Sequence, residues 1–185
     1  MQPHDRVYVA GHRGLVGSAI VRRLTGCSVG PPSPTAAGKR PTPPTAEGGC
    51  ATGSVDHPCP TTERFSNIIT RTRDALDLRD RAAVDRFFAE TRPQYVFLAA
   101  ATVGGIHANS SRGAEFIRDN LLIQTHVIDA AHRFGAKKLL FLGSSCIYPR
   151  DAAQPIREDS LLAGPLEPTN QPDAVAKIAG IEMCR

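Results

Sequence analysis

The sequence lacks any long apolar run. Its longest apolar stretches, such as residues 96–103, fall far short of the ~20 residues that cross a bilayer. The N-terminus is polar and leads directly into a predicted strand, so no signal peptide is visible. Basic and acidic residues, 22 and 18 of them, are intermixed, without a basic block or a basic patch interleaved with aromatics. Neither a membrane nor a nucleic acid is therefore expected as a partner.

Cysteine is scarce and irregularly spaced. The five cysteines form no C-x-x-C pair and lie at Cys27, Cys50, Cys59, Cys146 and Cys184. An odd number without such spacing supports neither a disulfide framework nor a zinc site, so we expect a cytoplasmic protein with reduced thiols and no metal. Cys50, His57 and Cys59 have the chemistry to chelate a metal, but they lie in a segment without the pattern of a folded element.

Large apolar residues are almost absent from residues 25–62, which are rich in proline, glycine, threonine and serine instead. Such a segment buries too little apolar surface to offset the entropy that is lost on ordering. Because a compact domain rarely needs so long a connection, we predict a disordered insert there.

The rest of the chain alternates between short apolar runs and amphipathic stretches. The apolar runs predict strands at residues 6–11, 66–71, 94–99 and 138–143. The amphipathic stretches predict helices at residues 15–24, 81–90 and 113–134, and a last one from about residue 174. Strands that are apolar throughout and alternate with helices form a parallel sheet covered on both faces. We therefore predict an α/β protein with a Rossmann-type doubly wound parallel sheet of about four strands.

A glycine-rich turn joins the first predicted strand to the first predicted helix. It consists of Gly11, His12, Arg13, Gly14, Leu15, Val16 and Gly17. The first glycine permits a tight turn, the second lets the backbone approach a pyrophosphate, and the third lets the helix pack closely. Free N–H groups at the helix start favour phosphates. In this context the motif predicts a dinucleotide contact along all seven residues.

The end of the second predicted strand carries two arginines, Arg71 and Arg73, before Asp74. An acidic residue at this place favours NAD, whereas arginine favours the 2′-phosphate of NADP. Guanidinium groups bind phosphate in a bidentate manner, and Arg13 adds a third one, so the sequence predicts NADP. For Arg71, an exposed residue at a strand end is the competing interpretation.

Three further residues are candidates for catalysis. Ser144 and Cys146 follow the fourth predicted strand, at the edge where doubly wound sheets bind ligands, and Lys177 lies on the last helix. Ser144 is able to hydrogen-bond a substrate carbonyl or hydroxyl, and Cys146 to transfer a proton if the pKa of its thiol is lowered. The competing interpretation of Cys146 is a small buried residue.

Together these motifs resemble the extended short-chain dehydrogenase/reductases, also called the NAD-dependent epimerase/dehydratase family, and within them the GDP-L-fucose synthase family. The resemblance covers residues 6–24 and 66–185 and includes V-A-G-H-R-G-L-V-G-S-A-I, R-T-R-D-A-L-D-L, L-L-F-L-G-S-S-C-I-Y-P and L-E-P-T-N-Q-P. It implies that residues 1–185 are an NAD(P)-binding Rossmann domain, interrupted by the insert and incomplete at the C-terminus, because chains of that family run well beyond this point.

The resemblance implies an epimerase-reductase that converts GDP-4-keto-6-deoxy-D-mannose to GDP-L-fucose with NADPH. By it, Ser144 contacts the sugar ketone, Cys146 transfers protons during epimerisation, and Lys177 binds the nicotinamide ribose. It also implies cofactor contacts from Arg73, Asp77, Leu78, Leu142, Gly143, Ser144, Ser145 and Lys177. Relatives pair through two helices, equivalent here to residues 113–134 and the last helix, which implies a homodimer.

The sequence departs from the resembled pattern in three places. Asp173 stands where the family has the tyrosine that donates a proton during reduction, and Thr102 where it has a lysine. None of the six histidines occupies the place of the histidine that partners the cysteine. Aspartic acid side chains are ionised at neutral pH, so Asp173 has no proton to give. We expect Asp173 to cap the last helix and to pair with Lys177 instead, four residues later.

Two interpretations follow from these departures and both stay open. One is the NADP-binding portion of an epimerase-reductase whose turnover is weak or absent. The other is a non-catalytic module that binds a dinucleotide or a full-length partner. Ser144, Ser145, Cys146 and Arg73 argue against a general NAD-dependent sugar-nucleotide epimerase or dehydratase.

Overall fold

The computed structural model describes residues 1–26, 64–104 and 111–185. Its parallel sheet has the strand order β2-β1-β3-β4. The strands are β1 (Val7–Ala10), β2 (Ile68–Ile69), β3 (Tyr95–Leu98) and β4 (Lys138–Phe141). The helices are α1 (Leu15–Thr25), α2 (Arg81–Thr91), α4 (Gly113–Arg133) and α5 (Gln171–Met183). Two short 3-10 turns, η1 (Ser145–Ile147) and η2 (Glu158–Ser160), lie between β4 and α5.

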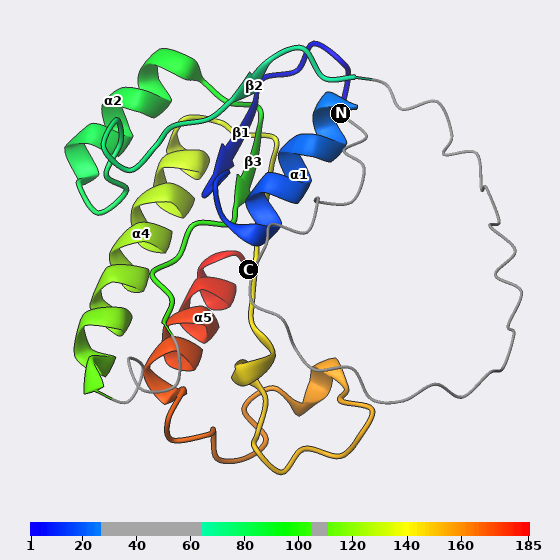
Figure 1. The fold of residues 1–185 in the computed structure, drawn as a ribbon, viewed down its shortest axis with the longest axis vertical. Helices are drawn as coiled ribbons and strands as arrows, with labels where there is room; N and C mark the ends of the chain where they lie inside the picture. Colours follow the sequence, from blue (N-terminus) through cyan, green and yellow to red (C-terminus); the bar gives the residue numbers. More distant parts are fainter. Residues whose placement is uncertain (27–63, 105–110) are drawn as a thin grey trace, which may run out of the picture.

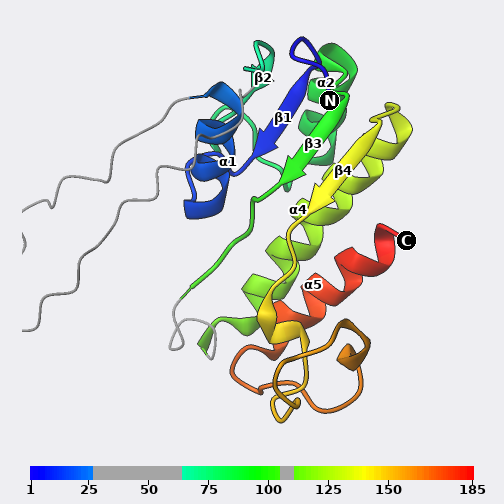
Figure 2. The ribbon, with the colours of Figure 1, turned by 90° about the vertical axis from the view of Figure 1, so that its right-hand side faces the viewer.

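Helices cover both faces of this sheet. Helix α1 lies on one face, and α2, α4 and α5 lie on the other (Figures 1 and 2). The predicted α/β fold with a doubly wound parallel sheet is therefore confirmed. The chain leaves β1 toward β2 in one direction and continues from β3 to β4 in the other, so the connection reverses between β1 and β3. Ligands of such sheets bind beyond the carboxyl ends of the strands at this switch point.

The core packs β1 against α2. All four residues of β1 are buried, because the strand has a neighbour on either side and helices on both faces. The ring of Tyr8 lies 4.7 Å from that of Phe87 and 6.0 Å from that of Phe88, measured between centroids. Val84, Phe87 and Phe88 are buried, as the helical spacing predicts for the inner face of this helix.

Local signals explain where the helices begin and end. The Asp80 side chain accepts a hydrogen bond from the Ala83 N–H (3.2 Å) and so caps α2. Gly135 takes the left-handed conformation (φ 74°) just after α4, where glycine is favoured. The last helix begins at Gln171, earlier than the predicted start near residue 174, because a proline is well tolerated in a first helical turn.

The edge strands differ from the prediction. Strand β2 spans two residues instead of residues 66–71, and among the described residues it pairs with β1 alone. Strand β4 also lies at an edge, and Leu140 on it is exposed. An apolar edge strand of this kind favours self-association.

The predicted insert at residues 25–62 falls almost wholly on residues 27–63, outside the described residues, together with Cys50, His57 and Cys59. Thr25 itself is the last residue of α1, and Gly26 caps that helix. No helix in the three described ranges is long and apolar enough to cross a membrane. Within the same part of the chain, no three His, Cys, Asp or Glu side chains gather in a way that would hold a metal ion.

Candidate functional site

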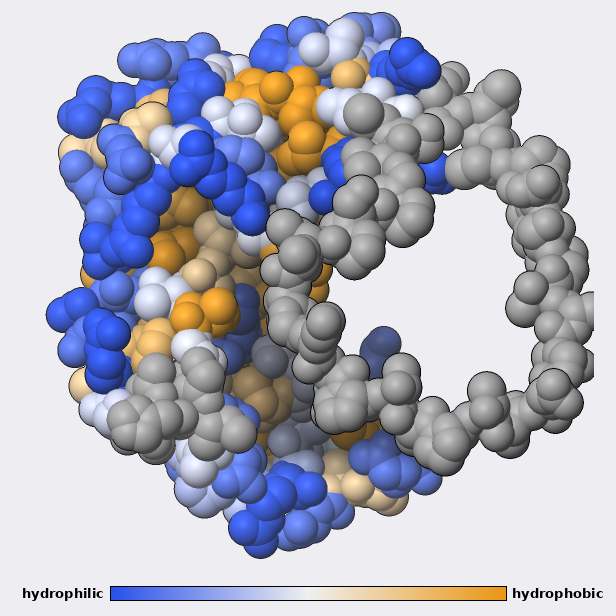
Figure 3. All heavy atoms as spheres, viewed as in Figure 1, coloured by the Kyte–Doolittle hydropathy of each residue, from blue (hydrophilic) through white to orange (hydrophobic). Residues whose placement is uncertain are grey.

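A pocket of about 300 Å³ lies at the switch point of the sheet. Its walls come from the glycine-rich turn after β1, the segment after β2 and the segment after β3. Of the predicted cofactor-binding residues, those that line it are Gly11, His12, Arg13, Gly14, Arg73, Asp77 and Leu78. Figure 3 shows this face of the molecule hollowed near its middle, with hydrophilic side chains along the rim. We call this cavity the switch-point pocket.

The remaining predicted cofactor-binding residues do not line the switch-point pocket: Leu15, Val16, Gly17, Leu142, Gly143, Ser144, Ser145 and Lys177. Leu15 and Val16 are exposed on the first turn of α1. Residues 142–145 follow β4, one strand further from the switch point than β3. For these residues cofactor contact stays a prediction.

The glycine-rich turn is shaped by close backbone approach. A side chain at Gly11 (φ 82°) would place its Cβ 2.6 Å from the backbone nitrogen of Ala100. At Gly17 the Cβ would overlap the carbonyl oxygen of Gly11 and lie 2.7 Å from its carbonyl carbon. Gly14 is exposed, and a Cβ there would meet its nearest atom, the Gly11 carbonyl oxygen, at 3.4 Å, close to an ordinary contact. Gly17 thus serves helix packing and Gly14 keeps the turn accessible, as the motif predicts.

The arginines at the pocket differ in what holds them. Within the described residues, the guanidinium groups of Arg13 and Arg73 form no hydrogen bond or ion pair, and both residues are exposed at the pocket. The Arg71 guanidinium lies 5.5 Å from the centroid of the Phe87 ring and donates to the Thr70 carbonyl (2.9 Å). Arg13 and Arg73 are therefore the better placed of the three to receive an anionic group.

Arg79 links the pocket to helix α4. It donates to both carboxylate oxygens of Asp77 (2.7 and 3.0 Å) and to Asp119 on α4 (3.0 Å). These hydrogen bonds lower the pKa of Asp77 from 3.8 to about 2, and the pKa of Asp119 also lies below its ordinary value, chiefly because of Arg118 and then Arg79. Both carboxylates are ionised at neutral pH, and the segment after β2 is fastened to α4.

Substituting Arg79 will change the stability of the protein in acid. A carboxylate with a depressed pKa stabilises the folded state above its unfolded pKa, and this contribution is lost as the pH falls through the folded value. For Asp77 that window runs from about pH 4 down to about pH 2. We expect Arg79→Met to lower stability at neutral pH and to flatten its decline in this window, measured by urea unfolding at a series of pH values.

The matched control is Arg81→Met, which removes a more exposed arginine from the start of α2 that pairs with Asp85 and Asp129. Exposed ion pairs contribute little, so this variant should keep the wild-type pH profile. If the stability of Arg79→Met fell between about pH 4 and pH 2 as steeply as that of the wild type, the role given to Arg79 would be contradicted.

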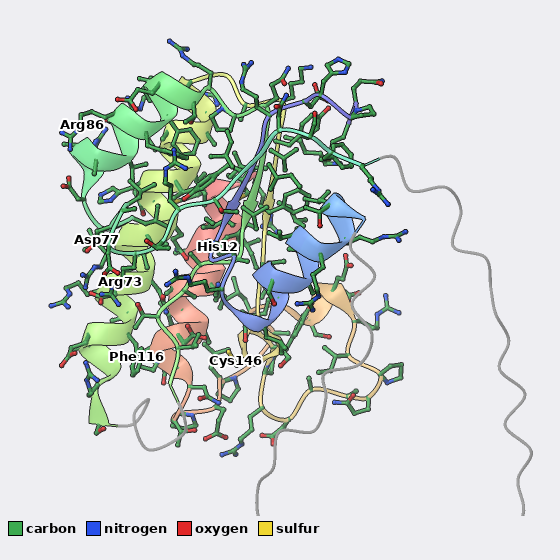
Figure 4. All side chains as sticks on the ribbon, turned by 45° about the horizontal axis from the view of Figure 1, so that its top comes forward. His12, Arg73, Asp77, Arg86, Phe116 and Cys146 are labelled. Atoms are coloured by element: carbon green, nitrogen blue, oxygen red, sulfur yellow. The ribbon has the colours of Figure 1, made fainter. Side chains whose placement is uncertain are left out.

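Two of the catalytic candidates, Ser144 and Cys146, gather with Asp173 near the start of α5. Ser144 follows β4, Cys146 lies in η1, and Asp173 lies in the first turn of α5. The Ser144 Oγ and Cys146 Sγ atoms are 3.0 Å apart, and the Cys146 thiol donates to Asp173 Oδ2 at 3.7 Å. We call Ser144, Cys146 and Asp173 the thiol cluster; Figure 4 shows Cys146 apart from His12, Arg73 and Asp77.

Lys177 is close to the thiol cluster but bonds elsewhere. Its side chain is 8% exposed, and its ammonium group donates to the Leu142 carbonyl (3.0 Å). The ammonium also lies 4.9 Å from the centroid of the Phe141 ring. Burial lowers the pKa of Lys177, and the nearby Asp173 and Cys146 partly offset this.

The role expected for Asp173 as a helix cap paired with Lys177 is wrong. The N-cap of α5 is Asn170, and the described residues show no ion pair within 4.0 Å between Asp173 and Lys177. The side chains diverge because Lys177 reaches a carbonyl after β4, while Asp173 faces Cys146 and Asn120 on α4.

The proton-transfer role of Cys146 depends on a lowered thiol pKa, and the structure gives the opposite shift. Burial raises the pKa of Cys146, and the negative charge of Asp173 raises it further. The hydrogen bond from Ser144 acts against both, but the pKa stays above the ordinary value. Cys146 is thus a neutral thiol at physiological pH.

Polar residues on the inner face of α4 belong to the site although the sequence argument passed over them. Asn120 is 2% exposed and accepts from the Thr102 N–H (2.7 Å) while donating to the Thr102 carbonyl and to Asp173 Oδ1 (both 3.0 Å). Gln124 donates to the Ala176 carbonyl (2.6 Å). The sequence contained a sign that these residues are buried. The polar residues recur at the helical spacing of the apolar residues on the same face of α4: Asp119, Asn120 and Gln124 beside Phe116, Ile123 and Val127.

Comparison with known proteins defines the class. The chain matches the NAD dependent epimerase/dehydratase family over residues 7–185, and so it belongs to that family. It is 49% identical over 185 residues to the putative GDP-L-fucose synthase 2 of Arabidopsis thaliana, and the match covers the whole chain and 45% of that protein. It is 46% identical over 180 residues to the GDP-L-fucose synthase of Escherichia coli (strain K12), covering 97% of the chain and 45% of the relative. The chain thus spans about 45% of the length of these relatives.

Solved structures give the same picture of the fold. A GDP-D-glycero-L-gluco-heptose synthase from Campylobacter jejuni, determined in the presence of NADPH, superposes with a TM-score of 0.77 at 34% identity. The GDP-mannoheptose C4 reductase MlghC from the same organism, with NADP bound, also superposes with a TM-score of 0.77 at 34% identity. Each match covers all of this chain, and 43% and 47% of the two solved chains.

Proposed function

We propose that residues 1–185 are the NADP-binding domain of a GDP-L-fucose synthase-like epimerase-reductase, with a nucleotide sugar, GDP-4-keto-6-deoxy-D-mannose, as the substrate of the complete site. The observation that carries the proposal is the switch-point pocket, where the glycine-rich turn meets Arg13 and Arg73, two arginines whose guanidinium groups form no hydrogen bond or ion pair within the described residues. The relatives named as GDP-L-fucose synthases supply the substrate class.

The residues at the pocket fit a dinucleotide phosphate. Gly11 and Gly17 bring backbone atoms so close that a Cβ would clash, and Gly14 leaves the N–H groups at the start of α1 accessible. His12 Nδ1 is buried without a hydrogen-bond partner among the described residues, on the same turn. NADPH, when bound, supplies the hydride that reduces a ketone. Arg73 and Arg13 would hold its 2′-phosphate, and Asp77 and Leu78 would contact the adenosine end.

The chemistry of reduction is impaired in this chain. Lys177 would bind the nicotinamide ribose, and Ser144 would contact the sugar ketone. The proton that an alkoxide needs has no donor at position 173, because an aspartate in contact with Asn120 and Cys146 accepts hydrogen bonds. Loss of a positioned general acid costs about 10²–10⁴-fold in rate. We therefore place the turnover of this chain well below that of an enzyme with tyrosine at position 173.

The test is a titration of the purified chain with NADPH, followed by an assay of NADPH oxidation with GDP-4-keto-6-deoxy-D-mannose. Binding without measurable oxidation is the expected result. Oxidation at a rate typical of enzymes, about 1 s⁻¹ or more, would overturn the impairment. Failure of a folded chain to bind NADPH would overturn the proposal as a whole.

Arg73 provides a sharper test of the cofactor. We expect Arg73→Ala to weaken NADPH binding about tenfold, because a charge-assisted contact to the 2′-phosphate is lost, and to leave NADH binding unchanged. The control is Arg86→Ala, since Arg86 lies on α2 outside the pocket (Figure 4). Equal weakening for both cofactors would show that Arg73 does not read the 2′-phosphate. Calorimetric titration of both variants measures the effect.

A non-catalytic dinucleotide-binding or partner-binding module is the second candidate, and the hydrogen bonds of Asp173 with Asn120 and Cys146 favour it.

We also propose that the protein assembles into a homodimer and lies in the cytosol. The apolar Val175 is exposed on α5 beside α4, which supports pairing through these helices. Cys146 is a free thiol, which supports a location where thiols stay reduced. Sedimentation velocity would measure the pairing.

A further inference from the structure

The thiol cluster contains an unusual partner for a cysteine. Cys146 is half-buried, and its thiol donates to Asp173 Oδ2 at 3.7 Å. Ser144 Oγ lies 3.0 Å from the same sulfur. Because the thiol has one hydrogen and that hydrogen goes to Asp173, the Ser144 hydroxyl is the donor in the second contact.

Asp173 is held in place by a second bond. Its Oδ1 accepts a hydrogen bond from Asn120 Nδ2 at 3.0 Å. Asn120 is itself fixed, since its side chain makes two bonds to the backbone of Thr102. One carboxylate oxygen is thus bound to a buried amide, and this directs the other oxygen toward the sulfur.

We propose that Asp173 is a positioning residue for Cys146, which accepts the thiol hydrogen, holds Cys146 in its protonated form and prevents the sulfur from reacting as a nucleophile. The inference goes beyond the proposed function and does not depend on cofactor binding. It gives the residue at the tyrosine position a role of its own: this arrangement protects a thiol and does not supply a proton to a ketone.

The charges around the sulfur are consistent with this role. From α5, Asp173 disfavours the thiolate, whereas the ammonium of Lys177 attracts it. From the segment after β4, Ser144 donates a hydrogen bond that favours the thiolate. Burial acts in the same direction as Asp173, and the balance raises the pKa of Cys146. Asn120 on α4 faces Asp173 and carries no charge.

The test is the rate at which iodoacetamide alkylates Cys146, followed by mass spectrometry of the tryptic peptide of residues 139–150, which contains no other cysteine. Asp173→Asn removes the negative charge and keeps an amide of the same shape. If the thiol pKa falls by about one unit, the thiolate fraction near pH 8 rises about tenfold. The lower intrinsic nucleophilicity of that thiolate offsets about a factor of three, so we expect alkylation to accelerate about threefold.

The control is Asp151→Asn, which removes a 75% exposed carboxylate from the loop after η1 and should leave the rate unchanged. A rate for Asp173→Asn equal to that of the wild type would overturn the proposal. If that variant fails to fold, Asp173→Ser removes the same charge with a smaller side chain: faster alkylation of Cys146 than in the wild type supports the proposal, and an unchanged rate overturns it.

Discussion

Replacement of Gly17 by alanine will destabilise the protein by about 3 kcal/mol and abolish NADPH binding. The Cβ would overlap the carbonyl oxygen of Gly11 and lie 3.0 Å from the Cα of His12. These are backbone atoms, so no side-chain rotation relieves the overlap, and either α1 or the turn must move. For a chain of this size, the loss corresponds to a fall of about 10 °C in the melting temperature.

Gly14→Ala is the control for this experiment, because it adds the same methyl group to the same turn. Its Cβ would lie 3.4 Å from the Gly11 carbonyl oxygen, close to ordinary contact. We expect this variant to lose less than about 1 kcal/mol. Comparable destabilisation by the two variants, measured by urea unfolding, would refute the assignment of Gly17 as the helix-packing glycine.

Asn120→Ala will cost about 3 kcal/mol of stability, as the second large effect. The asparagine is 2% exposed and satisfies three groups: the Thr102 N–H, the Thr102 carbonyl and Asp173 Oδ1. Alanine leaves these partners without their bonds in a place that water reaches poorly, and a buried polar group without a partner is costly. Urea unfolding measures the loss.

The matched control uses an asparagine at the surface. Asn67 Nδ2 donates one hydrogen bond, to the His4 carbonyl (2.7 Å), in an exposed place. Asn67→Ala should cost about 0.5 kcal/mol, because water replaces the lost partner. If Asn120→Ala were no more harmful than Asn67→Ala, the account of Asn120 as the link between Thr102 and Asp173 would be wrong.

The fold follows from local patterns in the sequence. The four apolar runs, the amphipathic helix at residues 81–90 and the glycine that ends α4 all appear where periodicity and capping residues place them. The start of α5 was predicted near residue 174, which is too late, because Pro172 lies in the first helical turn, where proline is well tolerated. The length of β2 depends on pairing with β1, which a local pattern does not contain.

The site was less predictable because it depends on contacts between distant segments. The glycine-rich turn and Arg73 could be read from their positions after strands. The sequence put Lys177 four residues from Asp173, and helical spacing alone favoured an ion pair between them. That pair does not form, because Leu142, 35 residues away, provides a carbonyl for Lys177, and Asn120, 53 residues away, binds Asp173.

Asp119 and Asn120 are neighbours on α4, yet they hold different parts of the molecule. Asp119 binds Arg79 beside the pocket, and Asn120 binds Asp173 at the start of α5. If this helical turn opened briefly, the hydrogen bonds that Asp119 and Asn120 form with Arg79 and Asp173 would break in one event. The segment after β2 and the first turn of α5 would then share one opening equilibrium, and their backbone amides would exchange with solvent as a cooperative unit.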